Sequence, residues 1–444
     1  MLLLLSSPVF SAPGTGTATI DPADDVTAGA PGTWTIIYVA SELFDSGELE
    51  IHIPDNWTPP QILNASLPGY VTVSTTGRLD DPALGISEQR IIVNIDSLAA
   101  GDSVYVVYGD TSGNPGGIAT AQTTAESSVE FTVRSDTDGF SSGPIVNSPT
   151  LNVLAGPITS LIFKTSSQTI TAGGESNVMR IRTEDVYGNP SSVPADQDIT
   201  LSTTSGTGTF SHLPGGSWSD TTTVTITSGA DTVSFYYRDS TAGTFSITAS
   251  ADGQAWPSAQ QPVTVEVADP YRLVVTPEDT TATAGDYVRF RLEVQDQYGN
   301  TSPVAADQTI TLFPGGGIFY DKDDHGTQLT ELVISSGSSS AEVDYRHTVM
   351  DTDQGYVLAF WDQDIVPPSL TTASTSIYID FANADAAVSE LEGDKSTITA
   401  DDLDELEVTV TIRDAFGNPV SGSSVTLEAT GTGNTIVDPG VTGT

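Results

Sequence analysis

The sequence predicts an all-β protein built from several sandwich domains in tandem. Segments of alternating apolar and polar residues recur along the chain, a period-two pattern typical of strands with one buried face. A short stretch, Asp-x-aromatic-Gly-Asn, occurs three times at spacings of one small β domain. No helical period of useful length is present. With 444 residues, the chain is long enough for three or four domains of about 100–150 residues each.

The recurring stretch begins at Asp185, Asp296 and Asp414, so successive copies are 111 and 118 residues apart. Each copy ends an alternating segment. Asp accepts hydrogen bonds from nearby amides, Gly tolerates positive φ, and Asn readily adopts the left-handed conformation. We therefore expect a strand-ending turn rather than a ligand site, with the aromatic ring folded back onto its own sheet. The predicted turn residues are Asp185, Gly188, Asn189, Asp296, Gly299, Asn300, Asp414, Gly417 and Asn418.

Further anchors of the second repeat return in the third at offsets of 108 to 112 residues, among them Thr-Ala-Gly at 171–173 and 283–285. Offsets held this closely indicate a duplicated domain. The predicted segments are 1–12 (signal-peptide-like), 13–155 (N-terminal β-sandwich), 156–268 and 269–382 (repeated domains), and 383–444 (a fourth copy expected to be truncated and marginal). Short linkers containing Pro157 and Pro270 favour an elongated array.

The first twelve residues contain an apolar run, Leu2 to Leu5, followed by small residues up to Ala12. This order is typical of the apolar core and cleavage region of a signal peptide, although the positive n-region is missing. The alternative is a stray apolar N-terminus. The remainder has no apolar run of about 20 residues, so no membrane span is predicted.

The composition is strongly acidic, with 58 Asp and Glu against 14 Lys and Arg and a formal charge of −44. This balance argues against nucleic acid and anionic membrane surfaces as partners. The chain has no Cys, so its fold cannot depend on disulfides. Secreted eukaryotic sandwich domains usually carry them, and a bacterial or archaeal surface protein is therefore expected.

Residues 410–420, Val-Thr-Ile-Arg-Asp-Ala-Phe-Gly-Asn-Pro-Val, followed by Val-Thr-Leu at 425–427, resemble the bacterial Ig-like domains of the invasin/intimin type (group 1). The segments 156–268 and 269–382 resemble the same family more loosely, and Thr301 replaces Pro after Asn300. The resemblance implies tandem Ig-like domains that hold a binding module away from a cell. It departs from invasin-like adhesins, in which an outer-membrane barrel precedes the array.

Few residues suggest catalysis or metal binding. The stretch Gly101-Asp102-Ser103 matches a short esterase block, but a strand follows it, so a strand-entry turn is expected. The four His residues are scattered without metal-ligand spacing. Tyr237 and Tyr345 are expected to pack in the core with one backbone hydrogen bond each. Trp57, Trp218, Trp256 and Trp361 fall in positions that do not predict one shared carbohydrate platform.

Acidic pairs are the better candidates for a cation site, because calcium binds about six to eight oxygen ligands that often come from loops. No pair matches the twelve-residue calcium loop, so solvated loops are the simpler interpretation and calcium binding stays open. The pairs are Asp136/Asp138, Asp321/Asp323/Asp324, Asp351/Asp353, Asp362/Asp364 and Asp401/Asp402/Asp404.

Together these features predict a non-enzymatic stalk or adhesin region, extracellular or on the surface of a bacterium or archaeon, with no cofactor assigned. The expected partner is an unidentified protein or glycan at a cell surface. The alternative is the accessory Ig-like region of a larger secreted enzyme, such as a polysaccharide hydrolase. A third interpretation is a cell-surface coat protein.

Overall fold

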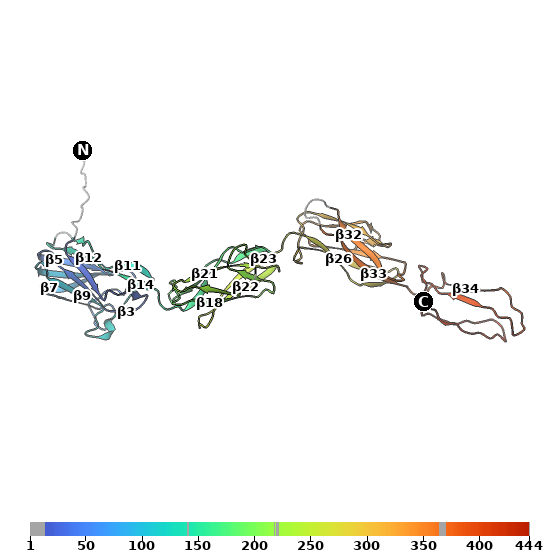
Figure 1. Cartoon of the computed structure of the whole chain (residues 1–444), viewed down its shortest axis with the longest axis horizontal. Coiled ribbons are helices and arrows are strands. Elements are labelled where there is room, and N and C mark those ends of the chain that lie inside the picture. Colours follow the sequence, from blue (N-terminus) through green and yellow to red (C-terminus); the bar gives the residue numbers. More distant parts are fainter. Residues whose placement is uncertain (1–13, 140–141, 217, 219–221, 364–369, 444) are drawn as a thin grey trace, which may run out of the picture.

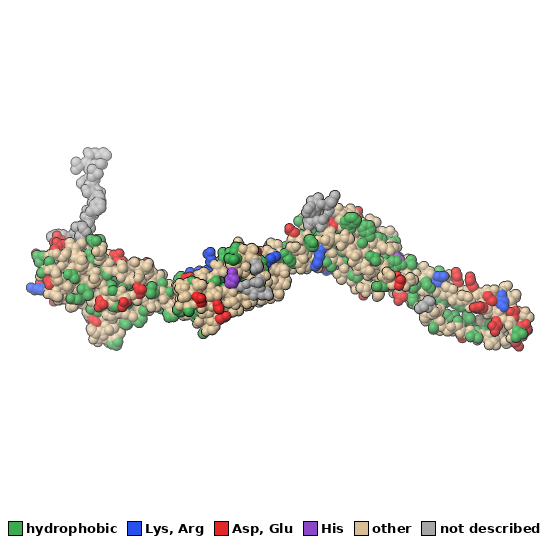
Figure 2. Space-filling view, viewed as in Figure 1, with side chains coloured by type: hydrophobic (Ala, Val, Ile, Leu, Met, Phe, Trp, Pro, Cys, Tyr) green, Lys and Arg blue, Asp and Glu red, His purple; other side chains and the backbone are tan. Residues whose placement is uncertain are grey.

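The computed structural model describes residues 14–139, 142–216, 218, 222–363 and 370–443. The signal-like segment 1–12 lies outside the described residues. Four β-rich units follow one another along the chain in an elongated row (Figure 1). The sole helical element of the described chain is a 3₁₀ turn, η1 (Pro115–Gly117). The predicted all-β class and the array of Ig-like sandwiches are therefore confirmed. Figure 2 shows acidic side chains on all four units.

Unit 1 pairs a four-stranded sheet, in the order β1-β4-β9-β6, with a five-stranded sheet, in the order β13-β12-β5-β8-β7. Two smaller sheets, β11-β14-β2 and β10-β3, lie at its boundary with the next unit. The bounds are β1 (Thr17–Asp21), β2 (Val26–Thr27), β3 (Pro31–Gly32), β4 (Trp34–Val39), β5 (Phe44–His52), β6 (Val71–Thr75), β7 (Arg78–Ser87), β8 (Arg90–Leu98), β9 (Ser103–Tyr108), β10 (Ala119–Thr120), β11 (Glu126–Glu130), β12 (Thr132–Asp136), β13 (Gly143–Pro144) and β14 (Thr150–Leu154).

The core of unit 1 follows from the alternation of its strands. In β4, Trp34, Ile36 and Tyr38 are buried, and the residues between them are partly exposed. Trp57 packs edge-on against Trp34, with ring centroids 4.8 Å apart. Its indole nitrogen donates a hydrogen bond of 3.2 Å to the Gln122 side chain, so this ring is core and not a binding platform.

Units 2 and 3 share one two-sheet topology. In unit 2 the sheet β15-β17-β21-β19 faces the sheet β16-β23-β22-β18-β20. Its strands are β15 (Ser160–Phe163), β16 (Gln168–Thr171), β17 (Met179–Glu184), β18 (Gln197–Thr203), β19 (Thr209–Ser211), β20 (Thr223–Ile226), β21 (Thr232–Arg238), β22 (Gly243–Ala251) and β23 (Ala259–Glu266).

In unit 3 the sheet β24-β26-β31-β28-β29 faces the sheet β25-β33-β32-β27-β30. Its strands are β24 (Arg272–Pro277), β25 (Thr281–Thr283), β26 (Tyr287–Gln295), β27 (Gln308–Phe313), β28 (Ile318–Tyr320), β29 (Gln328–Leu329), β30 (Glu331–Ile334), β31 (Ser340–Arg346), β32 (Tyr356–Asp362) and β33 (Ala373–Asp380). In both units the first strand of the second sheet joins it in parallel, β16 to β23 and β25 to β33. The predicted duplication thus has a structural counterpart in strand order.

Each of units 1 to 3 has its own cluster of buried apolar side chains. Tyr237 and Tyr345, the two tyrosines predicted to pack in the core, are both fully buried but differ in their hydrogen bonds. Tyr345 donates to the backbone carbonyl of Pro314 at 2.8 Å, as expected. Tyr237 instead donates to the carboxylate of Asp239 at 2.5 Å, so the expected backbone bond is replaced there by a side-chain bond.

Unit 4 has two small two-stranded sheets, β34-β35 and β36-β37. Its strands are β34 (Glu390–Gly393), β35 (Val408–Thr411), β36 (Ser424–Val425) and β37 (Gly440–Val441). Large apolar side chains that alternation would direct inward are exposed here, including Leu391 at 65% and Leu406 at 43%. The described part of unit 4 therefore buries little apolar surface of its own.

Candidate functional site: the joints between units

The three Asp-x-aromatic-Gly-Asn stretches lie at the three joints between consecutive units. At the first joint, Asp185 follows directly after β17 and is 2% exposed. Its Oδ1 accepts from the amides of Tyr187 and Asn189 at 2.8 and 2.9 Å. Its Oδ2 accepts at 2.8 Å from the amide of Gly156, in the linker that joins units 1 and 2. One carboxylate therefore holds both the turn and the linker.

The same carboxylate geometry recurs at the other joints. Oδ2 of Asp296 accepts from the linker amide of Ala268 at 3.0 Å. Oδ2 of Asp414 accepts from the linker amide of Ala382 at 2.9 Å. In every copy the Gly of the stretch has a positive φ, 84° at Gly188, 95° at Gly299 and 89° at Gly417, a conformation that Gly adopts without strain.

The Asn of each stretch reaches across to the preceding unit. Asn189 donates from Nδ2 to the carbonyl of Thr123 at 2.8 Å and accepts at Oδ1 from the amide of Ala125 at 2.9 Å. Its Nδ2 also donates to Oδ2 of Asp185 at 2.8 Å, which fixes the amide orientation. The Asn side chain thus pairs with a loop of unit 1 in the way that a neighbouring strand would.

The two later Asn residues make the same pair of bonds. Asn300 holds the loop between β21 and β22 through the carbonyl of Ser240 (2.8 Å) and the amide of Ala242 (2.9 Å). Asn418 holds the loop between β31 and β32 through Thr348 (2.8 Å) and Met350 (3.0 Å). We refer to this Asp and Asn pair, repeated three times, as the Asp-Asn clamp.

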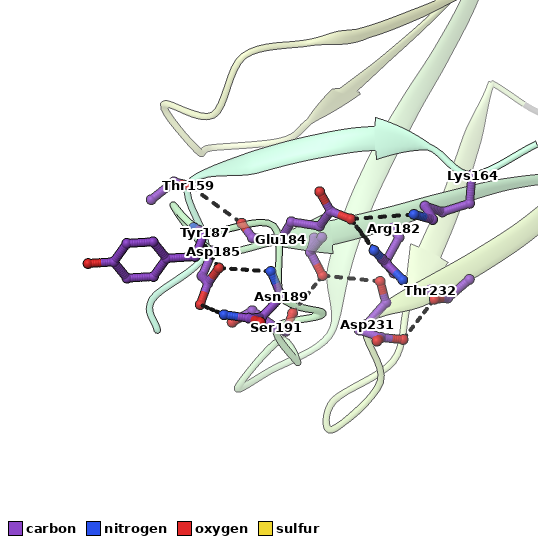
Figure 3. A network of polar contacts seen from close by, with 11 residues as sticks. Thr159, Lys164, Arg182, Glu184, Asp185, Tyr187, Asn189, Ser191, Asp231 and Thr232 are labelled. Carbon is purple, nitrogen blue, oxygen red and sulfur yellow. Dashed lines mark hydrogen bonds and ion pairs between the residues drawn. The ribbon is translucent and has the colours of Figure 1, made fainter. Parts of the chain in front are cut away.

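The aromatic ring of each stretch contacts a glycine of the preceding unit and does not fold back onto its own sheet, which corrects the expectation above. Figure 3 shows the Tyr187 ring pointing away from the strands of unit 2. It lies against Gly29, where an added Cβ would be 2.2 Å from the Tyr187 hydroxyl oxygen. Tyr298 lies against Gly173 and Phe416 against Gly285 in the same manner. All three glycines have positive φ.

The joints differ in two details. Ser191 Oγ and Ser302 Oγ each donate to a linker carbonyl at 2.7 Å, whereas Val420 occupies this position at the third joint. The third joint gains an arginine instead. The Arg346 guanidinium donates from Nε to the Gly285 carbonyl at 2.7 Å and lies 5.8 Å from the Phe416 ring centroid. That distance is within the range of a cation–π contact.

The clamp keeps its carboxylates ionised. Burial opposes ionisation, but hydrogen bonds from the Asn side chain and from three backbone amides outweigh it and lower the pKa of Asp185, Asp296 and Asp414 below their ordinary value. Next to the first clamp, Arg182 and Lys164 pair with Glu184 (Figure 3). Because four donors occupy the two oxygens of each clamp carboxylate, this group is suited to holding backbone and not to attacking a substrate.

The other acidic candidates lie in separate loops or at strand ends, and several of them accept hydrogen bonds from nearby backbone amides. Asp136 Oδ1 accepts from the amide of Gly139 at 2.8 Å, and Asp324 Oδ1 accepts from the amide of Gly326 at 2.9 Å. Asp364 lies outside the described residues. Within the described ranges no group of three or more His, Asp or Glu side chains is arranged to hold a metal ion. Solvated loops therefore stay the simpler interpretation of these acidic residues, and calcium removal tests the alternative.

Sequence reasoning missed the glycine partners and the direction of the aromatic ring. A partial signal was available, since Thr-Ala-Gly occurs at 27–29, 171–173 and 283–285, in each unit that precedes a clamp, although a further copy at 241–243 does not contact an aromatic ring of this kind. Of the helices in the described chain, none is long and apolar enough to cross a membrane.

The fold and the joints define a class: tandem Ig-like sandwich units linked by a repeated turn. The last unit can be assigned more closely. Residues 388–444 match the family model described as "Bacterial Ig-like domain (group 1)". The resemblance inferred from residues 410–427 is therefore confirmed for this unit. No curated protein matches the chain.

Several solved structures of surface proteins resemble the chain at low identity. The Escherichia coli adhesin FdeC shares 13% identity over 84% of this chain and 99% of its own, with a TM-score of 0.32. Invasin, described as a bacterial integrin-binding protein, shares 14% over 89% of this chain and 67% of its own, with a TM-score of 0.30. Domains 4–9 of the surface layer protein SbsC share 13% over 92% and 55%, with a TM-score of 0.22. Scores this low do not establish a shared function.

Proposed function

We propose that this chain is a non-enzymatic, extracellular spacer of an adhesin, which carries a binding surface away from a bacterial or archaeal cell. The observation that carries the proposal is the repetition of one Asp-Asn clamp at three joints. Hydrogen bonds at a joint restrict how the two neighbouring units bend relative to each other. Restricted bending is what a spacer needs, because a freely jointed chain would collapse toward the cell surface.

The charge supports the same function. At a formal charge of −44, neighbouring units repel one another, which favours extension and opposes association with nucleic acid or anionic membranes. The proposed partner is a protein or glycan at a cell surface. The nine turn residues are proposed to have a structural role at the joints and no part in ligand chemistry. The predicted unit boundaries at 155/156, 268/269 and 382/383 belong to this proposal, since each falls in a linker held by a clamp.

Small-angle X-ray scattering of the full chain tests the spacer function. A compact globule of this length has a radius of gyration of about 22 Å. Four units of roughly 30–40 Å each, arranged in a row, give about 40 Å. A value near 40 Å that changes little between low and high salt supports a jointed spacer. A value near that of one globule contradicts it.

The competing possibility, an accessory region of a secreted polysaccharide hydrolase, makes a different prediction. Such a region binds the insoluble polymer that its enzyme degrades. Depletion of the purified chain from solution by cellulose, chitin or xylan particles would favour it over the adhesin, whereas retention on cells or purified cell-surface proteins would favour the adhesin.

A further inference from the structure

The outer face of the second sheet of unit 3 exposes large apolar side chains. Figure 2 shows apolar side chains gathered over β32 on this unit. Strand β32 directs Leu358 and Phe360 into the core and exposes Val357 (61%) and Trp361 (58%) on the opposite face. The residues that form this face are Phe313, Val333, Val357, Trp361 and Tyr378, each at least 45% exposed. We name these five residues the β32 face.

Strand pairing places Phe313, Val357, Trp361 and Tyr378 at neighbouring positions, with Val333 on the edge strand β30 beyond Thr309 and Thr311. Phe313 pairs with Ala359, which lies between Val357 and Trp361 on β32. Val333 on β30 pairs with Thr309 on β27. Thr311, two residues further along the same face of β27, pairs with Trp361. On the other side of β32, Val357 pairs with Ser376 on β33, and Tyr378 lies two residues further along the same face of β33. The apolar groups therefore span four adjacent strands.

Unit 2 provides an internal comparison, because its second sheet has the same order and register. The matching positions there are Ser202, Thr225, Ser246, Ser250 and Thr264. All five are small hydroxyl residues, which suit a solvated sheet face. The fold therefore does not require apolar residues at these positions, and unit 3 departs from unit 2 at all five. Contiguous exposed apolar surface of this kind marks an interaction site.

The sheet that forms the β32 face carries acidic side chains but no Lys or Arg. Strands β25, β27, β30, β32 and β33 contain no Lys or Arg, and the ionisable side chains that they expose include Glu331 and Asp380. Every cation of unit 3 lies on the first sheet or in its loops: Arg272, Arg289, Arg291, Lys322 and Arg346. A partner that brings Lys or Arg to the rim would gain attraction, whereas a second copy of this acidic chain would meet repulsion.

The polar groups beside Trp361 are engaged with one another. Gln363 donates from Nε2 to Thr311 Oγ1 and, at 2.9 Å, to a Glu331 carboxylate oxygen. A sugar-binding platform pairs its rings with polar groups that are available to the ligand. The composition here, with Trp, Tyr and Phe beside two Val, is instead that of the apolar centre of a protein interface.

We propose that the β32 face docks a partner protein through an apolar segment flanked by Lys or Arg. This inference rests on the proposed adhesive function, to which it adds a contact surface and a partner chemistry. Its test does not depend on the overall shape of the molecule. If scattering showed a compact chain that still bound the peptide through this face, the spacer proposal would be wrong and the docking proposal would be retained.

The test uses three immobilised peptides of equal length: alternating Leu and Lys, alternating Leu and Glu, and alternating Ser and Lys. The variant replaces the five residues by their unit 2 counterparts: Phe313→Ser, Val333→Thr, Val357→Ser, Trp361→Ser and Tyr378→Thr. The control transfers the face to unit 2: Ser202→Phe, Thr225→Val, Ser246→Val, Ser250→Trp and Thr264→Tyr. Thermal unfolding checks each full-length protein, and the single change Trp361→Ser serves if the five-fold variant does not fold.

We expect the Leu/Lys peptide to bind the native chain at least about ten-fold more tightly than the five-fold variant and the Leu/Glu peptide. The transferred face should raise binding further. For Trp361→Ser alone we expect a loss of about three-fold or more. Two results would attribute binding to overall charge and overturn the proposal. One is equal binding of the Leu/Lys peptide to the native chain and the five-fold variant, and the other is equal binding of the Leu/Lys and Ser/Lys peptides to the native chain. Self-association abolished by the variant, or neutral-glycan binding abolished by it, would assign the face to a second copy or a glycan and overturn it equally.

Discussion

Asn189 donates a hydrogen bond of 2.8 Å to the backbone carbonyl of Thr123, a residue 66 positions earlier and in the preceding unit. The Asn189 side-chain amide presents one N–H and its carbonyl oxygen to the loop in the geometry of a peptide group, while its second N–H donates to Asp185, so it can pair with the loop as a neighbouring strand would. Asn300 and Asn418 make the same contact, so the turn in each later unit holds a loop of the unit before it and orients the two units.

Replacing Asn300 by Ala should loosen the joint between units 2 and 3. The change leaves the Ser240 carbonyl and the Ala242 amide without their partner, at a cost of about 1–3 kcal/mol for such groups. Because the chain has no Cys, one spin label can be attached to each unit through an introduced Cys, and the distance distribution should broaden. Asn94→Ala removes a bond within unit 1 and should leave that distribution unchanged. An equally narrow distribution in Asn300→Ala would mean that the clamp does not hold the joint.

Gly173 should tolerate a methyl group far less than Gly229 in the same unit. Both have positive φ, 76° and 83°, so Ala costs about 1–2 kcal/mol of backbone strain at either. A Cβ on Gly173 would lie 1.7 Å from the Tyr298 hydroxyl oxygen, whereas a Cβ on Gly229 meets nothing within 4 Å.

The comparison is read from spin-label distances across the second joint. Gly173→Ala should shift and broaden the distribution, and Gly229→Ala should not. Adding Tyr298→Ala to Gly173→Ala should restore part of the native distribution by removing the clash. If both Gly variants behave alike, the aromatic contact is incidental.

The sequence was sufficient for the fold because its signals are local. Alternation in Trp34, Ile36 and Tyr38 reports which face of one strand is buried, and the Asp-to-Asn spacing reports a turn. The joint could not be predicted in the same way. The partner of Tyr298 is Gly173, 125 residues earlier. No periodic pattern links two such residues, and a ring folded back on its own sheet was the simpler local interpretation.

Calcium removal should leave the melting temperature unchanged within about 1 °C at fixed ionic strength. The loop carboxylates proposed as ligands already accept hydrogen bonds from their own loops, as Asp324 does from Gly326 and Thr327. A cation would have to displace these bonds and collect about six oxygens. Differential scanning calorimetry with and without a chelator checks this expectation. A fall of several degrees, reversed by added calcium, would establish a calcium site in the acidic loops.

The joints should loosen in acid before the sandwiches unfold. The pKa of Asp296 in the closed joint lies below its ordinary value of 3.8, because hydrogen bonds from Asn300 and three amides outweigh the opposing effect of burial. Protonation makes the Asp296 carboxyl a weaker acceptor for the linker amide of Ala268 and for the Asn300 side chain that holds unit 2, so the acid form favours the open joint. The stabilisation is complete above the ordinary pKa and is lost as the pH falls through the lowered pKa.

Spin-label distances across the second joint should accordingly stay narrow from about pH 7 to pH 5 and broaden below about pH 4, while circular dichroism reports that the strands persist. Asp296→Asn supplies the matched control, since it removes the titrating carboxylate and should give a distribution that is broader at neutral pH and insensitive to acid. A native joint that stayed narrow at pH 2 with folded units, or that broadened as the pH rose, would show that the ionised Asp296 carboxylate does not hold units 2 and 3 together.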